Sequence, residues 1–463
     1  MELKLDPNEI SGLSPEDAAI IRKLVNVYDK HKTANAKKDR FYEGLISLDS
    51  VNLGLALPAG MKGLEVGCAW GAKCVDVLAA RSMFDGFVGS NGEDVPEIDR
   101  IVVGNRLIAA YMIAARDELK YGCTFATLSA DEALGCKIRF HSPQTASAIW
   151  DGERGRIACG MAIIDTAPDN TSGDTWSPSL INVYLDNAVI VLSRVEGVWK
   201  AERLPNPMGR PLMEPLIWNA TSGKPFGRSR LKAPIRDLIE DYVRTLANAT
   251  IALEFATAPQ KYMLGVTEDQ YDTLTAQKFT QYVGSIIAAT TNPETGEKPT
   301  FGQLTQGSLT PHVEKLRMIA TQFSAATGLT VADVGVVNDA NPTSSDAILA
   351  QSQTLVAMAE QLNVGNGDAL RTIALMAIAI ANNTTVEKLS DEQKAIVPHF
   401  KNPAMPSVAV TADAAIKIAG SREGFAGTDT FLEMIGFDQA DIRRIKAQER
   451  LERGMQTLLG EFA

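Results

Sequence analysis

Cysteine and histidine are scarce in this chain, and neither is spaced as a metal or redox site requires. The 463 residues include five cysteines, an odd number with no CxxC pair, and four histidines that lie far apart. No two histidines are four residues apart, so a zincin-type site has no basis. We therefore expect reduced thiols and no metal site. The residues are Cys68, Cys74, Cys123, Cys136, Cys159, His31, His141, His312 and His399.

Positive charge is also in short supply. The chain has 45 Lys and Arg residues against 56 Asp and Glu residues, which gives a net charge of -11. A protein that grips nucleic acid by neutralising phosphates has a basic excess instead. The acidic balance therefore argues against a tight nucleic-acid binder. It is compatible with a protein through which DNA slides, because tight phosphate contacts would oppose sliding.

Long apolar runs are absent. The most apolar window, Ala374 to Ala381, is far below the ~20 residues that a bilayer-spanning helix requires. No basic region precedes an apolar run at the N-terminus, so we expect neither a secretory signal nor a membrane partner. The composition, 45% hydrophobic and 22% charged, is that of a folded protein, and the length fits two or three structural regions.

Catalytic signatures are missing as well. The sequence has no nucleophile elbow, phosphate-binding loop or paired-carboxylate pattern, so we expect no catalytic residue and no cofactor. Ser229 has no histidine near it in sequence and is interpreted as a helix N-cap. One enzyme alternative stays open. The segment from Gly63 to Gly71 is similar to the loop by which methyltransferases hold adenosylmethionine, although Trp70 departs from that pattern.

The first half of the chain predicts helices followed by antiparallel strands. Helical patterns run from a Ser14 cap to Gly44, from Lys73 into a turn and strand near Phe87, and from Asn105 to Gly122. Six further segments alternate in polarity or carry β-branched runs, with turns between them, which is typical of an antiparallel meander. These are Lys137–His141, Ala146–Trp150, Ile157–Ile164, Ile181–Leu185, Val189–Ser193 and Val198–Arg203.

A long amphipathic helix dominates the middle of the chain. Pro234 fits only its first turn, and the helix has to end before Pro259. A second amphipathic helix runs from Pro311 to Gly328. We expect the apolar face of the first helix to be a packing surface; its residues are Ile235, Leu238, Ile239, Tyr242 and Leu246.

The last third predicts mostly helix. One helix from Ser345 to Gln361 is expected to be interrupted at Gly365-Asn-Gly367 and to resume from Asp368 to Ala381. A proline-punctuated linker follows from Pro398 to Pro406. Two more helices are expected over Asp413–Ile418 and Asp438–Leu459.

Two blocks of sequence give these elements a family context. Gly227-Arg-Ser-Arg-Leu231, a long helix and Ala256-Thr-Ala-Pro-Gln-Lys-Tyr262 follow one another, and Ala325-Ala-Thr-Gly-Leu-Thr330 precedes Asn341-Pro-Thr-Ser-Ser-Asp-Ala-Ile348. This order resembles the portal (head-to-tail connector) proteins of long-tailed bacteriophages. The resemblance covers roughly Lys73 to Ala381. It implies a non-enzymatic protein with an α+β, mostly helical portal fold, assembled as a ring.

The resemblance also implies a division of the chain into regions. The assignment is a wing at 1–232, a stem helix at 233–258, a clip at 259–308, a second stem helix at 309–327, a tunnel loop at 328–343, a wing helix at 344–388 and a crown at 389–463.

A function and a set of partners follow from the same resemblance. The family forms a dodecameric ring at one capsid vertex, through which double-stranded DNA is packaged by the terminase and later ejected. The implied partners are other copies of the chain, the major capsid and scaffolding proteins, the terminase large subunit, a head-to-tail adaptor or neck protein, and DNA in transit without sequence specificity. The implied location is the virion, after assembly in the cytoplasm of the host bacterium.

Two loops are expected to carry contacts in such a ring. Between Arg317 and Arg371 there is no Lys or Arg, while five acidic residues fall in that interval. An acidic loop that repels phosphates mildly would let DNA pass. The expected DNA-channel residues are Asp333, Asn338, Asp339 and Asn341, and the expected clip contacts are Asn292, Glu294, Glu297 and Lys298.

Overall fold

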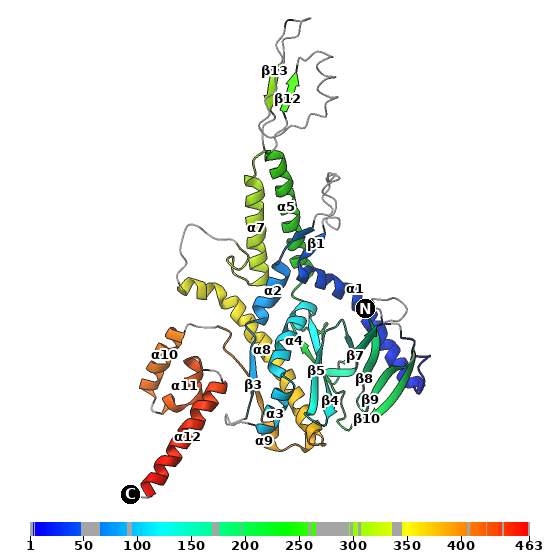
Figure 1. The fold of residues 1–463 in the computed structure, drawn as a ribbon, viewed down its shortest axis with the longest axis vertical. Coiled ribbons are helices and arrows are strands. Elements are labelled where there is room, and N and C mark those ends of the chain that lie inside the picture. The colour runs from blue at the N-terminus through cyan, green and yellow to red at the C-terminus, as the bar shows by residue number, and fades with distance from the viewer. Residues whose placement is uncertain are drawn as a thin grey trace.

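Helices and antiparallel sheets both contribute to the fold (Figure 1), which agrees with the expected α+β class. The computed structural model describes residues 3, 5–47, 65–89, 95–168, 176–195, 197–257, 261–264, 296, 300–303, 307–335, 345–404, 408–422, 424–437 and 439–461. The helices are α1 (Pro15–Glu43), α2 (Trp70–Ala79), α3 (Pro96–Gly104), α4 (Leu107–Tyr121), α5 (Ala233–Thr257), α7 (Thr310–Thr327), α8 (Ser345–Ala381), η3 (Val386–Lys388), α9 (Asp391–Lys394), α10 (Val408–Ser421), η4 (Phe425–Gly427), α11 (Asp429–Met434) and α12 (Gln439–Glu461).

The strands range from three to 13 residues, and every pair formed between named strands is antiparallel. They are β1 (Leu45–Ser47), β2 (Glu65–Gly67), β3 (Phe84–Val88), β4 (Cys123–Asp131), β5 (Gly135–His141), β6 (Ala146–Asp151), β7 (Arg156–Pro168), β8 (Trp176–Tyr184), β9 (Ala188–Val195), β10 (Val198–Pro205), β11 (Met213–Ile217), β12 (Lys261–Leu264), β13 (Thr300–Gln303) and β14 (Val397–Phe400).

Helix α1 begins and ends where the local sequence predicts. The Ser14 side chain accepts a hydrogen bond from the backbone N–H of Asp17, and Gly44 ends the helix in the left-handed conformation with φ 76°. One face of the helix packs into a cluster with residues of β7, β8 and β9, which belong to a five-stranded sheet. The Tyr28 hydroxyl donates to the Gln144 carbonyl at 2.8 Å. The helix therefore covers one face of that sheet.

Two sheets take the place of the single meander expected between Lys137 and Arg203. Five of the six expected segments do form a meander, in the order β10-β9-β8-β7-β6. The exception is Lys137–His141, which lies in β5 and pairs with β4 in a separate sheet, β11-β4-β5. Strand β11, where Met213 pairs with Thr127, was not expected. Pairings so distant along the chain leave no local pattern.

The expected linker from Pro398 to Pro406 begins instead as a strand. Strand β14 pairs with β3, with His399 opposite Gly86. The Phe400 ring lies 5.8 Å from that of Phe84 and 5.9 Å from that of Tyr111, measured between ring centroids. These contacts join the C-terminal third of the chain to its first third; residues 405–407 lie outside the described part.

Helix α8 is continuous, so the predicted interruption at Gly365-Asn-Gly367 is wrong. Asn366 is fully buried, and its Nδ2 donates to the Tyr111 hydroxyl at 2.9 Å and to Glu118 Oε2 at 2.7 Å. These tertiary contacts outweigh the low helix propensity of two glycines.

Length and composition would also allow α8 to span a membrane. The segment Ser352–Ala381 has a mean hydropathy of 1.3, which corrects the expectation that no apolar window is long enough. Burial inside the protein accounts for this composition, since 56% of the apolar window is buried. Leu370, Ile373 and Ala377 belong to a cluster with Phe84 and Tyr111, which we name the α8 core.

Helices α5 and α7 lie side by side and project from the rest of the molecule (Figure 1). We name them the helix pair. Strands β12 and β13 pair beyond its far end, so the chain leaves along α5 and returns along α7. Helices α10 to α12 lie at the opposite end of the molecule, and α10 and α12 include the two helices expected there. The sequence also predicts a helix over residues 268–287, and this segment lies outside the described residues.

Candidate functional site: the helix pair and its base

The predicted apolar face of α5 forms the inner side of the helix pair. Ile235 and Ile239 are buried in one cluster with Ile319 and Phe323 of α7. Leu238 and Tyr242 are half-buried and pack against that cluster, while Leu246 is only partly covered. The helical period thus identified the packing face, and Gly328 ends α7 in the left-handed conformation, as expected.

Aromatic rings close the base of the helix pair. Trp70, from the start of α2, lies 4.0 Å from the Tyr242 ring and 4.7 Å from the Phe323 ring, measured between centroids. A Cβ atom at Gly71 would lie only 1.9 Å from the Phe41 carbonyl oxygen, so this glycine serves close packing of α2 against α1.

The segment around β2 and Trp70 does not have the structure of a methyltransferase cofactor site. Strand β2 has three residues and pairs antiparallel with β1, whereas a cofactor-binding fold of that type needs a doubly wound parallel sheet. The Trp70 side chain packs where a small, glycine-rich turn would be required. Residues 63 and 64 of the proposed motif lie outside the described residues. The enzyme alternative from Gly63 to Gly71 has no support here.

Arg230 connects the base of the helix pair to the body, a role that the sequence did not reveal. Its guanidinium is buried, with Nε donating to the Cys74 carbonyl and Nη2 to the Thr327 carbonyl, both at 2.7 Å. Both acceptors lie on helices, one in α2 and one at the end of α7. A single side chain therefore joins three segments that are distant in sequence.

Ser229 is not an N-cap, contrary to expectation. Helix α5 begins at Ala233, and the first helical hydrogen bonds run from Ile235 and Arg236 to the Lys232 carbonyl. The Ser229 hydroxyl instead donates to the Lys120 carbonyl at 2.5 Å and accepts from the backbone N–H of Leu231 at 2.9 Å. It holds the segment before α5 against the end of α4.

The expected channel loop is described only at its start. Leu329 and Val334 are buried in the same cluster as the helix pair. Asp333 Oδ2 accepts from the Thr330 backbone N–H at 3.0 Å and from its hydroxyl at 2.8 Å, so this carboxylate stabilises a local turn. Asn338, Asp339 and Asn341 lie outside the described residues. The channel-facing role of all four stays a prediction.

The expected clip contacts cannot be located in the same way. Asn292, Glu294, Glu297 and Lys298 all lie outside the described residues. The described part of that region is the β12–β13 pairing, with Tyr262 opposite Gly302. It lies at the far end of the helix pair (Figure 1).

Apolar side chains also lie on the outside of the helix pair. Leu253 of α5 is 49% exposed, and Val313 and Met318 of α7 are 46% and 47% exposed. One ion pair crosses between the helices, from Lys315 Nζ to Asp241 Oδ2 at 2.8 Å. The helix pair therefore buries one apolar face between its two helices and leaves Leu253, Val313 and Met318 partly exposed to solvent.

The cysteines and the candidate metal ligands are residue types that can carry reactive chemistry. All five cysteines are unpaired and buried, as expected of reduced thiols. Burial raises the pKa of Cys68 to about 11 and that of Cys123 to about 12, so both thiols are protonated at neutral pH. In the part of the chain that the structure describes, no three His, Cys, Asp or Glu residues are grouped to hold a metal ion.

Comparison with protein families gives the decisive observation. The model of the phage portal protein family, SPP1 Gp6-like, matches residues 70–454. The chain belongs to this portal family. The family resemblance read from Lys73 to Ala381 is thereby confirmed, and the match extends into the C-terminal helices.

Individual portal proteins are similar over most of their length. The portal protein of Mycobacterium phage L5 is 24% identical over 424 residues, covering 88% of this chain and 84% of the relative. That of Mycobacterium phage D29 is 23% identical over 454 residues, covering 95% and 90%.

Similar solved structures come from gene transfer agent particles. A chain of the native virion covers 87% of this chain and 93% of its own length, at 12% identity and a TM-score of 0.46. A chain of the native neck, computed with C12 symmetry, covers 80% and 89%, at 13% identity and a TM-score of 0.45.

Proposed function

We propose that copies of this portal-family chain close into a ring that surrounds a DNA channel at one capsid vertex, with twelve copies in the virion. Double-stranded DNA enters through this channel during packaging and leaves through it during ejection. Family membership supports the portal role itself. No enzymatic step is part of the proposal, because the portal family is structural.

The exposed apolar side chains of the helix pair are the observation that carries ring formation. Leu253, Val313 and Met318 are each about half exposed on a projecting element. Among the described residues, α5 packs substantially only on α7, α2 and β2, and none of these except α7 covers its outer part. A head-to-tail contact repeated by rotation would cover these groups on every copy and leave no free end.

The same proposal divides the chain into regions. We propose the helix pair as the stem, residues 1–232 and 344–388 as the wing, 259–308 as the clip, 328–343 as the tunnel loop and 389–463 as the crown. The clip assignment is supported by the position of β12 and β13 at the far end of the pair (Figure 1). The tunnel-loop assignment is supported by the absence of Lys and Arg between Arg317 and Arg371.

Partners are assigned to these regions on the same basis. The clip would contact the terminase large subunit during packaging and the adaptor or neck protein afterwards, through Asn292, Glu294, Glu297 and Lys298. The wing would contact the major capsid and scaffolding proteins. DNA in transit would pass Asp333, Asn338, Asp339 and Asn341 without sequence-specific contacts. The protein would thus assemble in the host cytoplasm and reside at the portal vertex of the virion.

Electron micrographs and a packaging assay test this proposal together. Purified wild-type protein should give closed rings with a central channel. Deletion of residues 292–298 should leave the rings intact and abolish packaging of DNA into proheads, because the docking surface for the motor is removed. Protein that remains monomeric or dimeric would contradict the ring. Rings that package normally after the deletion would contradict only the clip assignment.

A further inference from the structure

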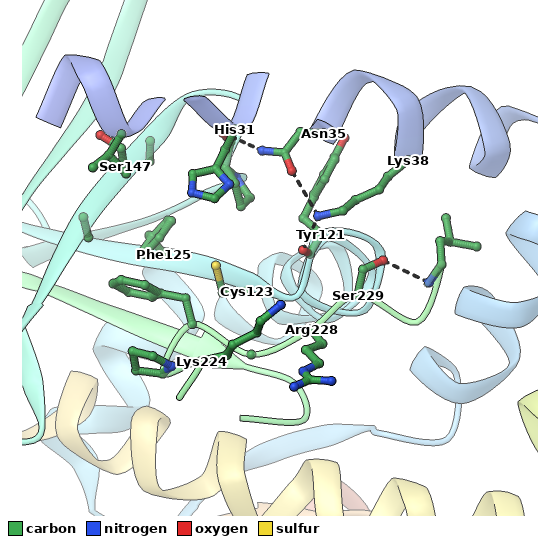
Figure 2. A pocket seen from close by; sticks show the side chains of 18 of the residues that line it. His31, Asn35, Lys38, Tyr121, Cys123, Phe125, Ser147, Lys224, Arg228 and Ser229 are labelled. Atoms are coloured by element: carbon green, nitrogen blue, oxygen red, sulfur yellow. Dashed lines mark hydrogen bonds between the residues drawn. The ribbon is translucent and has the colours of Figure 1, made fainter. Parts of the chain in front are cut away.

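A cavity of 820 Å³ lies beside the start of α5. Its walls come from α1, from strands β4 and β6, and from the segment 223–236 that leads into α5 (Figure 2). Figure 2 shows Lys224 and Arg228 on one side, with His31, Asn35 and Lys38 of α1 on the other. The two basic walls of the cavity lie nearly 200 residues apart in the chain, so no local sequence pattern reveals it.

Charge sets this cavity apart from the rest of the molecule. Five cations and one histidine line it, and no Asp or Glu does, in a chain whose net charge is -11. None of the five cations takes part in an ion pair among the described residues. These six residues are His31, Lys38, Lys224, Arg228, Lys232 and Arg236.

Two of the cations are held in place by neutral groups. Lys38 Nζ donates to Asn35 Oδ1 at 3.1 Å and to the Tyr121 carbonyl at 2.8 Å. Arg236 Nη1 donates to the Leu231 carbonyl at 2.6 Å, while its Nε is buried without a hydrogen-bond partner among the described residues. Burial lowers the pKa of Lys38, and the nearby Arg236 acts in the same direction. The cavity therefore carries positive charge that no carboxylate neutralises.

The uncharged lining indicates which kind of anion would fit. Tyr28, Phe125, Pro143 and Phe226 form apolar walls, and Ala146 to Ala148 belong to β6, the edge strand of the five-stranded sheet. A duplex presents its phosphates on a convex surface and needs an open cationic face. A concave site with apolar walls and cations suits a protein segment that carries carboxylates.

We infer that this cavity receives an exposed carboxylate from the neighbouring copy of the chain, namely Glu360 in the first half of α8, residues 345–363. This inference rests on the proposed ring. That half of α8 contains no Lys or Arg, and Glu360 is exposed. Helix α8 begins on the side of the molecule opposite α1 (Figure 1), as a head-to-tail contact between rotated copies requires.

The position of the cavity is consistent with this assignment. Lys232 and Arg236 lie at the beginning of α5, so the cavity adjoins the helix pair whose exposed apolar groups need cover. A carboxylate held between several cations would fix the orientation of one copy relative to the next. The exposed apolar groups of the helix pair would supply buried surface area to the same contact. The ring contact would then be partly electrostatic and sensitive to salt.

Photo-crosslinking tests the pairing directly. Arg228→p-benzoylphenylalanine places a crosslinker at an exposed cation of the cavity. Rings assembled from isotopically light and heavy copies should give a mixed light–heavy crosslink between position 228 and residues 345–363. Crosslinks only within one copy, crosslinks to another segment, or no crosslink in intact rings would overturn the inference. Failure of the wild type to form rings would instead contradict the proposed function.

Charge reversal gives a second test. K224E/R228E should weaken ring association by about tenfold at low salt, and E360K should restore part of that loss. The matched control K388E/R422E makes the same charge change at two exposed residues outside the cavity and should assemble normally. Unaltered assembly of K224E/R228E would overturn the inference. So would crosslinking of position 228 to an added 30-base-pair duplex, which would assign the cavity to nucleic acid.

Discussion

The α8 core and the helix pair bury their apolar surfaces in opposite ways. Helix α8 packs against β4, β5, β11 and β14 as well as α2 and α3, so several elements of its own chain cover it. In the outer part of the helix pair, the described elements leave α5 and α7 packed on each other, and Val313 and Met318 are about half exposed. Among the described residues, the α8 core is thus covered by its own chain, whereas the outer apolar groups of the helix pair are not. Stability and assembly should accordingly respond to different substitutions.

The largest effect on the isolated subunit is expected in the α8 core. Phe84 is 2% exposed and lies 5.1 Å from the Phe87 ring. Phe84→Ala should lower the free energy of unfolding by about 3–5 kcal/mol, because it leaves a cavity among rings that cannot collapse. Phe301→Ala, at a residue that is 52% exposed in β13, is the matched control and should cost little. Chemical denaturation measures both, and equal losses would contradict the comparison.

Glu118, which is hydrogen-bonded to Asn366 of α8, should make the stability of the protein depend on pH. Glu118 is completely buried, and burial raises its pKa to about 8, although the hydrogen bond from Asn366 acts against this. The folded state holds a proton there that the unfolded state releases above its ordinary pKa. The stability contributed by that proton is fully present below about pH 4.5 and is lost as the pH rises to about 8.

Glu118→Gln should remove this dependence. Between the two pKa values the wild type should lose up to about 1.4 kcal/mol per pH unit relative to the variant. Glu314→Gln, at an exposed residue of α7, serves as the control. The measurement is the free energy of unfolding from pH 4 to pH 9. Parallel curves for the wild type and Glu118→Gln would show that this carboxyl does not titrate as described.

The smallest effect is expected from the ion pair within the helix pair. Lys315 and Asp241 are 41% and 36% exposed, so water and salt screen their attraction. Lys315→Ala should cost less than about 1 kcal/mol and should cost less still at high salt. A double-mutant cycle with Asp241→Asn isolates the coupling. A coupling of several kcal/mol would mean that polar contacts, rather than apolar ones, hold the two helices together.

Local sequence signals predicted some of these elements well. Ser14 and Gly44 mark the ends of α1, and Gly328 marks the end of α7, because caps and left-handed glycines act within a few residues. The apolar period of α5 identified Ile235 and Ile239 as buried. The order of two sequence blocks was sufficient for the family.

Non-local contacts could not be predicted in the same way. Asn366 between two glycines suggested a break, and only its burial against Glu118 and Tyr111 keeps α8 continuous. The β3–β14 pairing and the bonds of Arg230 join segments that share no local pattern. The basic cavity has the same origin, since Lys38 and Arg228 meet only in the fold.

The mass of a surface variant tests the central claim most directly. Val313→Asp/Met318→Asp adds two charges to the exposed side of α7, and Gln322→Asp adds one charge at an exposed polar residue of the same helix. Light scattering should give the wild type and Gln322→Asp a mass many times the 49.8 kDa of one chain. The double variant should scatter as a single chain with an unchanged denaturation midpoint. Rings of normal mass from the double variant would contradict the claim that the exposed apolar groups of the helix pair close the ring.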